Sequence, residues 1–309
     1  MAGHETDHEA VYDEALLGGD ATHWAFGTSF EDPLAGVDTT VPADVDPAEL
    51  ASYCLMLGDD ALVYSHRLSE WCSRAPDLEE DIALANIALD LLGQARLLLA
   101  RAAASDPGAV PVLPEGSPVP PEDALAFFRG DHEFRSTRLV EGRDGDFAVT
   151  VARLLLFSTW RLALLERLRE SRDPVLAAIA AKGVKEVTYH RDYAGRWFLT
   201  LARGTDESRS RLLAALPVVW AFHDELFISH EIERAMAAAG VGVDPGDVAD
   251  EVGVVLDEVL SVSGVDRPEV PQVGPVARGR GRDGRHTEEL SHLLAEMQSV
   301  ARAHPLGRW

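Results

Sequence analysis

The chain has 309 residues, enough for one large domain or two smaller ones, and 46% of them are hydrophobic, which allows a sizeable buried core. Its net charge of −24 argues against nucleic-acid and anionic-membrane partners, because binding to phosphate groups requires a basic surface. The longest apolar runs, such as residues 154–157, are too short to span a bilayer. The N-terminus is acidic and lacks the features of a secretory leader, so we expect a cytoplasmic protein.

Residues 1–45 are acidic and without helical periodicity, and we predict a partly disordered extension there. We predict one helical domain over residues 46–309. Two proline-containing turns, at 74–76 and 171–174, each join a pair of long helices, and a loop rich in proline and glycine at 105–121 separates the two pairs. Helices are expected at about 47–71, 78–101, 123–141, 147–169, 174–201, 207–238 and 247–260, and from about 287 onward.

Two helix pairs joined by one long crossover, without a convincing strand, predict an all-α fold. The arrangement is that of a ferritin-like four-helix bundle with additional C-terminal helices. When such a bundle binds di-iron, two helices supply one glutamate each, and the other two supply Glu-x-x-His. The glutamate and histidine of each pair point inward because residues three apart share one face of a helix.

The second and fourth helices do not contain a complete Glu-x-x-His pair. In the second helix the best overlay puts Leu91 at the acid position and Gln94 at the histidine position. In the fourth helix, taking His190 as the ligand puts Val187 at the acid position. Taking Glu186 as the acid puts a tyrosine at the histidine position. Each candidate pair therefore lacks one ligand.

Because each tight turn joins two antiparallel helices, it determines which positions of the two helices lie opposite each other. Positions 91–94 face positions 57–60, where two aspartates stand, whereas the third helix contains no Asp or Glu over residues 151–165. We therefore expect this chain to bind no metal or other cofactor. A buried polar network is expected in its place, because buried charges need partners, although some members could instead face solvent. Its members would be Asp59, Asp60, Asp90, Gln94, Glu186 and His190.

Four segments together resemble the PaaC-type subunit of the multicomponent phenylacetyl-CoA 1,2-epoxidase. The resemblance covers about residue 50 to the C-terminus, and several long motifs match in order. The segments are LGDDALVYSHRLSEWC (57–72), APDLEEDIALANIALDLLGQARLLL (75–99), SRDPVLAAIAAKGVKEVTYH (171–190) and GRHTEELSHLLAEMQ (284–298).

This resemblance implies a part in an NADPH-dependent monooxygenase of aerobic phenylacetate degradation, which converts phenylacetyl-CoA to a ring epoxide. A related subunit would carry the di-iron centre and supply most of the contacts to phenylacetyl-CoA. A reductase and further small subunits would complete the complex. This chain would be a non-catalytic structural subunit that pairs with the catalytic one. The alternatives are an active di-metal carboxylate oxidase with unusual ligands and a helical scaffold unrelated to oxygenation.

Two arginine-rich clusters, at 129–138 and 278–287, stand out in so acidic a chain. They are candidates for contact with CoA phosphates or with another subunit. The second cluster precedes a predicted helix N-terminus, where backbone N–H groups favour anions. The alternative interpretation is a salt-bridged surface. The candidate contacts are Arg129, Glu133, Phe134, Arg135, Ser136, Arg280, Arg282 and Arg285.

Overall fold

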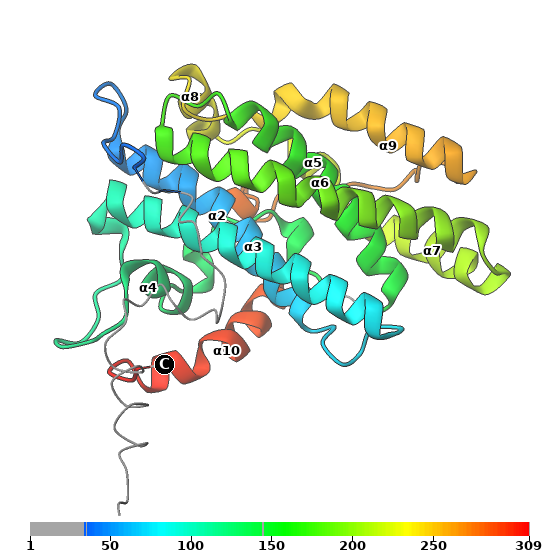
Figure 1. The fold of residues 1–309 in the computed structure, drawn as a ribbon, viewed down its shortest axis with the longest axis horizontal. Helices are drawn as coiled ribbons and strands as arrows, with labels where there is room; N and C mark the ends of the chain where they lie inside the picture. The colour runs from blue at the N-terminus through cyan, green and yellow to red at the C-terminus, as the bar shows by residue number, and fades with distance from the viewer. Residues whose placement is uncertain (1–33, 35, 144, 309) are drawn as a thin grey trace, which may run out of the picture. The chain divides into compact units, whose positions relative to one another are not determined.

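The computed structural model describes residues 34, 36–143 and 145–308 (Figure 1). These residues form nine α-helices and no strand, which confirms the predicted all-α, ferritin-like fold. The helices are α2 (Pro47–Ser69), α3 (Leu78–Ser105), α4 (Pro121–Phe127), α5 (Phe147–Leu168), α6 (Pro174–Arg203), α7 (Asp206–Trp220), α8 (Glu231–Ala238), α9 (Ala249–Ser263) and α10 (Glu288–Ala303).

The four long helices α2, α3, α5 and α6 form the bundle, as two antiparallel pairs. Each begins directly after an aspartate whose carboxylate accepts hydrogen bonds from backbone N–H groups of the first turn. Such caps satisfy donors that the helix itself leaves unpaired. The caps are Asp46, Asp77, Asp146 and Asp173.

The helical unit begins at Val37, ahead of the boundary predicted at residue 46. Val45 is buried, and the guanidinium of Arg101 on α3 donates a hydrogen bond of 2.6 Å to the carbonyl oxygen of Thr39. Residues 37–45 are therefore attached to the bundle. The rest of the predicted extension lies outside the described residues, apart from residues 34 and 36.

Two predicted helices are wrong in extent. Residues 123–141 do not form one helix: α4 ends at Phe127, and short 3-10 turns follow. The backbone N–H groups of Arg135 and Thr137 are bound instead by carboxylates of α2. The predicted helix at 207–238 divides into α7 and α8, because the His230 side chain caps a new helix by accepting from the N–H of Ile232.

Helix α5 is the most enclosed helix of the bundle, since α6, α7 and α9 pack against it and its Phe157 ring contacts the Tyr64 ring of α2. By length and hydropathy alone, α3 and α5 could each cross a membrane, so the expectation that every apolar segment is too short is wrong. In the described chain α5 is buried along nearly its whole length and α3 along about half of it.

The loop before α10 requires glycine where it crosses the loop after α4. A Cβ atom added at Gly281 would lie 2.0 Å from the backbone oxygen of Ser136. We expect Gly281→Ala to lower the free energy of unfolding by about 2 kcal/mol, because backbone atoms must move apart. Gly253, on α9, has open space around it and is the matched control. Gly253→Ala should raise stability by about 0.5–1 kcal/mol, and urea titration of both variants tests the contrast.

Candidate functional site

A buried arginine occupies the centre of the bundle, at the level where a metal site was considered. The Nε of Arg161 on α5 donates to the Oε1 of Gln94 on α3 at 2.9 Å, and its Nη1 donates to the carbonyl oxygen of Leu57 on α2 at 3.2 Å. The Nε2 of Gln94 donates in turn to Glu186 on α6 at 2.9 Å. One residue from each of the four helices thus meets at this level.

The environment of Arg161 is costly for a charge. Its side chain is 1% exposed, and its Nη2 has no hydrogen-bond partner among the described residues. Burial lowers the pKa of Arg161 to about 10, while the carboxylate of Asp60 acts in the opposite direction. The guanidinium therefore stays charged at neutral pH, as a fixed cation inside the bundle.

The residues at this level do not fit a di-iron centre. Leu91 and Val187, at the two acid positions, are buried apolar side chains. Gln94 is engaged with Arg161, and Glu186 is shared between Gln94 and the ammonium of Lys182. A pair of iron ions needs several carboxylates to neutralise it, and a guanidinium at the same place repels cations.

The predicted polar network is divided into separate groups. Gln94 and Glu186 belong to the arginine group, and Asp90 pairs with His190, the Oδ2 and Nε2 atoms lying 3.0 Å apart between α3 and α6. Asp90 is partly exposed, whereas His190 is buried. The two aspartates of α2 do not bond to either group, because they point to the loops after α4 and before α10.

Asp59 is completely buried and binds the loop after α4. Its two oxygens accept from both terminal nitrogens of Arg129, with Nη1 at 3.0 Å, and Oδ2 also accepts from the N–H of Arg135 at 2.8 Å. Arg129 in turn lies over the ring of Phe134 at 4.2 Å. This pair attaches the loop to the bundle from inside.

Asp60 attaches the segment before α10 to the bundle in the same way. It accepts from the Nη2 of Arg282 at 2.8 Å and from the N–H of Thr137 at 2.7 Å. Arg282 also lies 3.3 Å from a carboxylate oxygen of Glu233 on α8. Buried ion pairs therefore connect α2 with three segments that follow it much later in the chain.

The candidate CoA or subunit contacts lie at different depths in the chain. Arg129, Phe134, Ser136 and Arg282 are buried, and Arg129 and Arg282 are engaged by the aspartates of α2. The remaining candidates reach the surface to different degrees. Arg135 and Arg280 are half-buried, and Glu133 and Arg285 are exposed.

Arg161 was missed in the sequence although a signal was present. Between Phe147 and Leu165 the only charged residues of α5 are Arg153 and Arg161, in an otherwise apolar or neutral helix. Isolated charges in such a run imply burial with specific partners. A pattern of carboxylates alone does not reveal a cation of this kind.

A third buried carboxylate joins the loop after α4 to the start of α10. Both ring nitrogens of His286 face acceptors: Nδ1 lies 2.6 Å from an oxygen of Glu141, and Nε2 lies 3.0 Å from the carbonyl oxygen of Phe134. Glu141 also accepts from the N–H and hydroxyl of Thr287. Only the doubly protonated imidazole donates to both acceptors. Burial lowers the pKa of His286, but the hydrogen bond and charge of Glu141 outweigh it, so the pKa is raised.

The raised pKa predicts a pH-dependent stability. The contribution of His286 is complete below its unfolded-state pKa of 6.5 and is lost as the pH rises through the higher folded-state value. We expect His286→Gln to cost about 2 kcal/mol at about pH 6 and clearly less at about pH 9. Urea unfolding at both pH values measures this. The exposed His292 on α10 is the control, and an equal loss at both pH values for His286→Gln would contradict the prediction.

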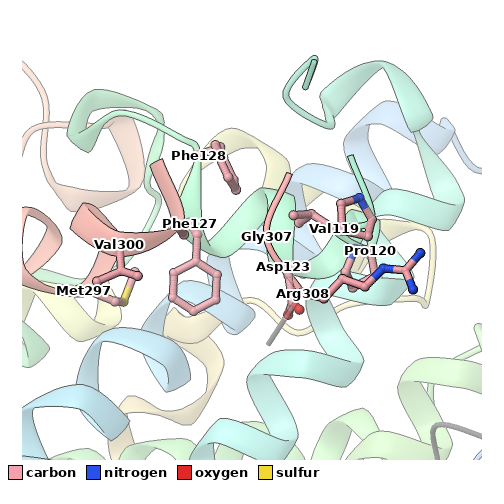
Figure 2. Close-up of a pocket in the computed structure, with 11 residues that line it drawn as sticks. Val119, Pro120, Asp123, Phe127, Phe128, Met297, Val300, Gly307 and Arg308 are labelled. Carbon is pink, nitrogen blue, oxygen red and sulfur yellow. The ribbon is translucent and has the colours of Figure 1, made fainter. Parts of the chain in front are cut away.

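A cavity of about 540 Å³ lies between α4, α10 and the C-terminal segment (Figure 2). Phe127, Met297 and Val300 form one side, and Asp123 and Arg308 lie together on another. None of the candidate residues predicted from the sequence lines it. Its lining is mainly apolar and belongs to elements outside the four-helix bundle.

Comparison with known proteins identifies the family. Residues 35–309 match the family described as phenylacetic acid catabolic protein. The chain belongs to this family. It is also 43% identical over 263 residues to the C component of the 1,2-phenylacetyl-CoA epoxidase of Escherichia coli strain K12, a match that covers 84% of this chain and 99% of the relative. The family resemblance predicted from the sequence is thereby confirmed.

Membership in this family assigns the chain a role in phenylacetate catabolism. The family match begins at residue 35, close to Val37, where the compact helical unit begins. The family's shared part therefore coincides with the bundle and the helices that the buried ion pairs attach to it.

Proposed function

We propose that this chain is a non-catalytic structural subunit of a phenylacetyl-CoA epoxidase complex, where it pairs with the di-iron catalytic subunit and stabilises it. The observation that carries the proposal is the guanidinium of Arg161 at the bundle centre, hydrogen-bonded to Gln94 at the position of a histidine ligand. The similarity to the C component of the Escherichia coli epoxidase supports the same assignment.

A bundle whose interior is held by a protein cation has a defined shape without any metal. Four helices meet at Arg161, and three carboxylates of buried pairs attach the surrounding loops. A bundle of this kind can offer its partner a rigid surface that holds the partner's helices, and therefore its iron ligands, in position. The reaction on phenylacetyl-CoA would then take place in the partner, with a reductase and further small subunits completing the complex.

The two alternatives have less support. An active di-metal oxidase would need carboxylates where Leu91 and Val187 are buried. A scaffold unrelated to oxygenation is disfavoured by the identity to an epoxidase subunit over nearly the whole of that relative.

Metal analysis together with size-exclusion chromatography tests the proposal. The full chain is purified alone and also co-expressed with its di-iron partner. We expect no stoichiometric metal in the chain alone and a stable, iron-containing complex with the partner. About two irons per chain in the isolated protein would overturn the proposal and support the oxidase alternative. Full activity and metal content of the partner without this chain would also contradict it.

A further inference from the structure

Helix α3 has a second apolar face, on the side away from the bundle. Leu78, Ile82, Ala85, Leu89 and Leu92 follow one another at intervals of four, three, four and three residues. The four large side chains among them are between 41% and 70% exposed, and Ala85 is half-buried. We call these five residues the α3 stripe. Single exposed apolar residues are common on protein surfaces, but a row of them along one helix marks an interaction surface.

Among the described residues, the neighbours of α3 leave this stripe uncovered. Helix α6 lies on one flank, where His190 pairs with Asp90, and α2 packs against the buried face of α3, with Gly58 beside Leu98 and Leu99. Helix α4 approaches the C-terminal part of α3, where Arg96 pairs with Glu122 at 3.7 Å. Figure 1 shows α3 on the near side of the bundle beside α6. The stripe therefore runs along the N-terminal half of α3, before α4 is reached.

The spacing of the stripe selects the kind of partner. Apolar residues that alternate at intervals of three and four form the seam by which two α-helices pack lengthwise. An extended peptide or a flat sheet does not match this period, because its side chains alternate every two residues. The partner should therefore present a helix with an apolar seam of its own.

The charge beside the stripe argues against a second copy of this chain. Between Leu78 and Ala95, α3 contains four carboxylates and no basic residue. Two copies packed through this face would bring carboxylates of both chains together, in a protein whose net charge is −24. A helix flanked by lysine or arginine would instead be attracted. The four carboxylates are Glu79, Glu80, Asp81 and Asp90.

We propose that the α3 stripe is the surface on which this chain binds a helix of a different subunit, one with an apolar seam and basic flanks. This inference rests on the proposed function, in which that subunit is the di-iron catalytic one. Packing the stripe against such a helix buries its leucine and isoleucine side chains and neutralises the carboxylates beside them.

The test uses the full chain co-expressed with the catalytic subunit, together with titration of the purified proteins. Leu89→Glu and Ile82→Glu place a charge in the stripe at exposed positions, so the fold should be retained. Circular dichroism and thermal unfolding check this. We expect each variant to raise the Kd by about tenfold or more, the effect of losing a central contact. The matched controls, Val254→Glu on α9 and Val300→Glu on α10, are 68% and 55% exposed in the wild type. They should leave the Kd within about twofold.

The outcomes separate this inference from the proposed function. If the wild type and the stripe variants bind the partner equally, the inference is wrong and the proposed function is retained. If the wild type does not bind the partner at all, both are overturned. Sedimentation of the chain alone tests whether a second copy occupies the stripe. A wild-type dimer that Leu89→Glu dissociates would show that it does and would overturn the inference.

Discussion

Asp59→Ala is expected to lower the free energy of unfolding by about 3–5 kcal/mol, the range for breaking a buried ion pair from one side. The carboxylate is completely buried, and its removal leaves the guanidinium of Arg129 without its charged partner in the interior. The N–H of Arg135 loses its acceptor as well. Urea or thermal unfolding measures the loss, and the loop after α4 should show faster amide hydrogen exchange.

The Asp257–Arg267 pair provides a matched control for this prediction. Its nitrogen and oxygen atoms are 2.7 Å apart, but both side chains are largely exposed. Asp257→Ala should therefore cost less than about 1 kcal/mol. The double variant Asp59→Ala with Arg129→Met should recover part of the loss, because no buried charge is then left unpaired. Equal losses of unfolding free energy for Asp59→Ala and Asp257→Ala would contradict the prediction, because burial of the Asp59–Arg129 pair would then make no difference to stability.

Arg161→Ala is expected to cost about 3 kcal/mol of stability, because it opens a cavity and removes the donor to a buried side-chain acceptor. That acceptor is the side-chain oxygen of Gln94, and the carbonyl oxygen of Leu57, which lies within α2, loses its additional donor. The loss should be visible in urea unfolding, and the complex with the catalytic subunit should weaken if the bundle interior holds the shape of its surface.

Arg167→Ala, near the end of the same helix, is the control for Arg161. Arg167 is 44% exposed and pairs with Glu251 at the surface, so its removal should change stability by less than about 1 kcal/mol. Arg161→Met retains most of the volume but not the hydrogen bonds, and it should fall between the alanine variant and the wild type. An alanine variant as stable as the wild type would mean that the guanidinium does not organise the bundle.

Both predictions concern the same property of the molecule, a bundle held together by buried charges that belong to the chain itself. Arg161 connects the four helices, while Asp59 and Asp60 connect α2 to loops that lie about 70 to 220 residues further along the chain. The structural role proposed for this chain would require such rigidity, because a partner held by its surface would depend on the shape of that surface.

Local signals in the sequence were sufficient for the long helices. The predicted starts at residues 47, 78, 147 and 174 agree with the structure, because aspartate caps and proline in the first turn act over a few residues. The segment 123–141 was predicted wrongly because its helical composition is overridden by distant carboxylates on α2. No local pattern contains that information.

The sequence by itself determined where the four long helices begin, their ferritin-like pairing and the apolar residues at positions 91 and 187, since each depends on neighbouring residues or on helix periodicity. Only the tertiary structure decided that Arg161 lies at the bundle centre, that Asp59 and Asp60 point away from it, and that the α3 stripe is left uncovered. The reason is physical: the partner of a buried charge, and the burial of an apolar face, are decided by packing between segments far apart in the chain.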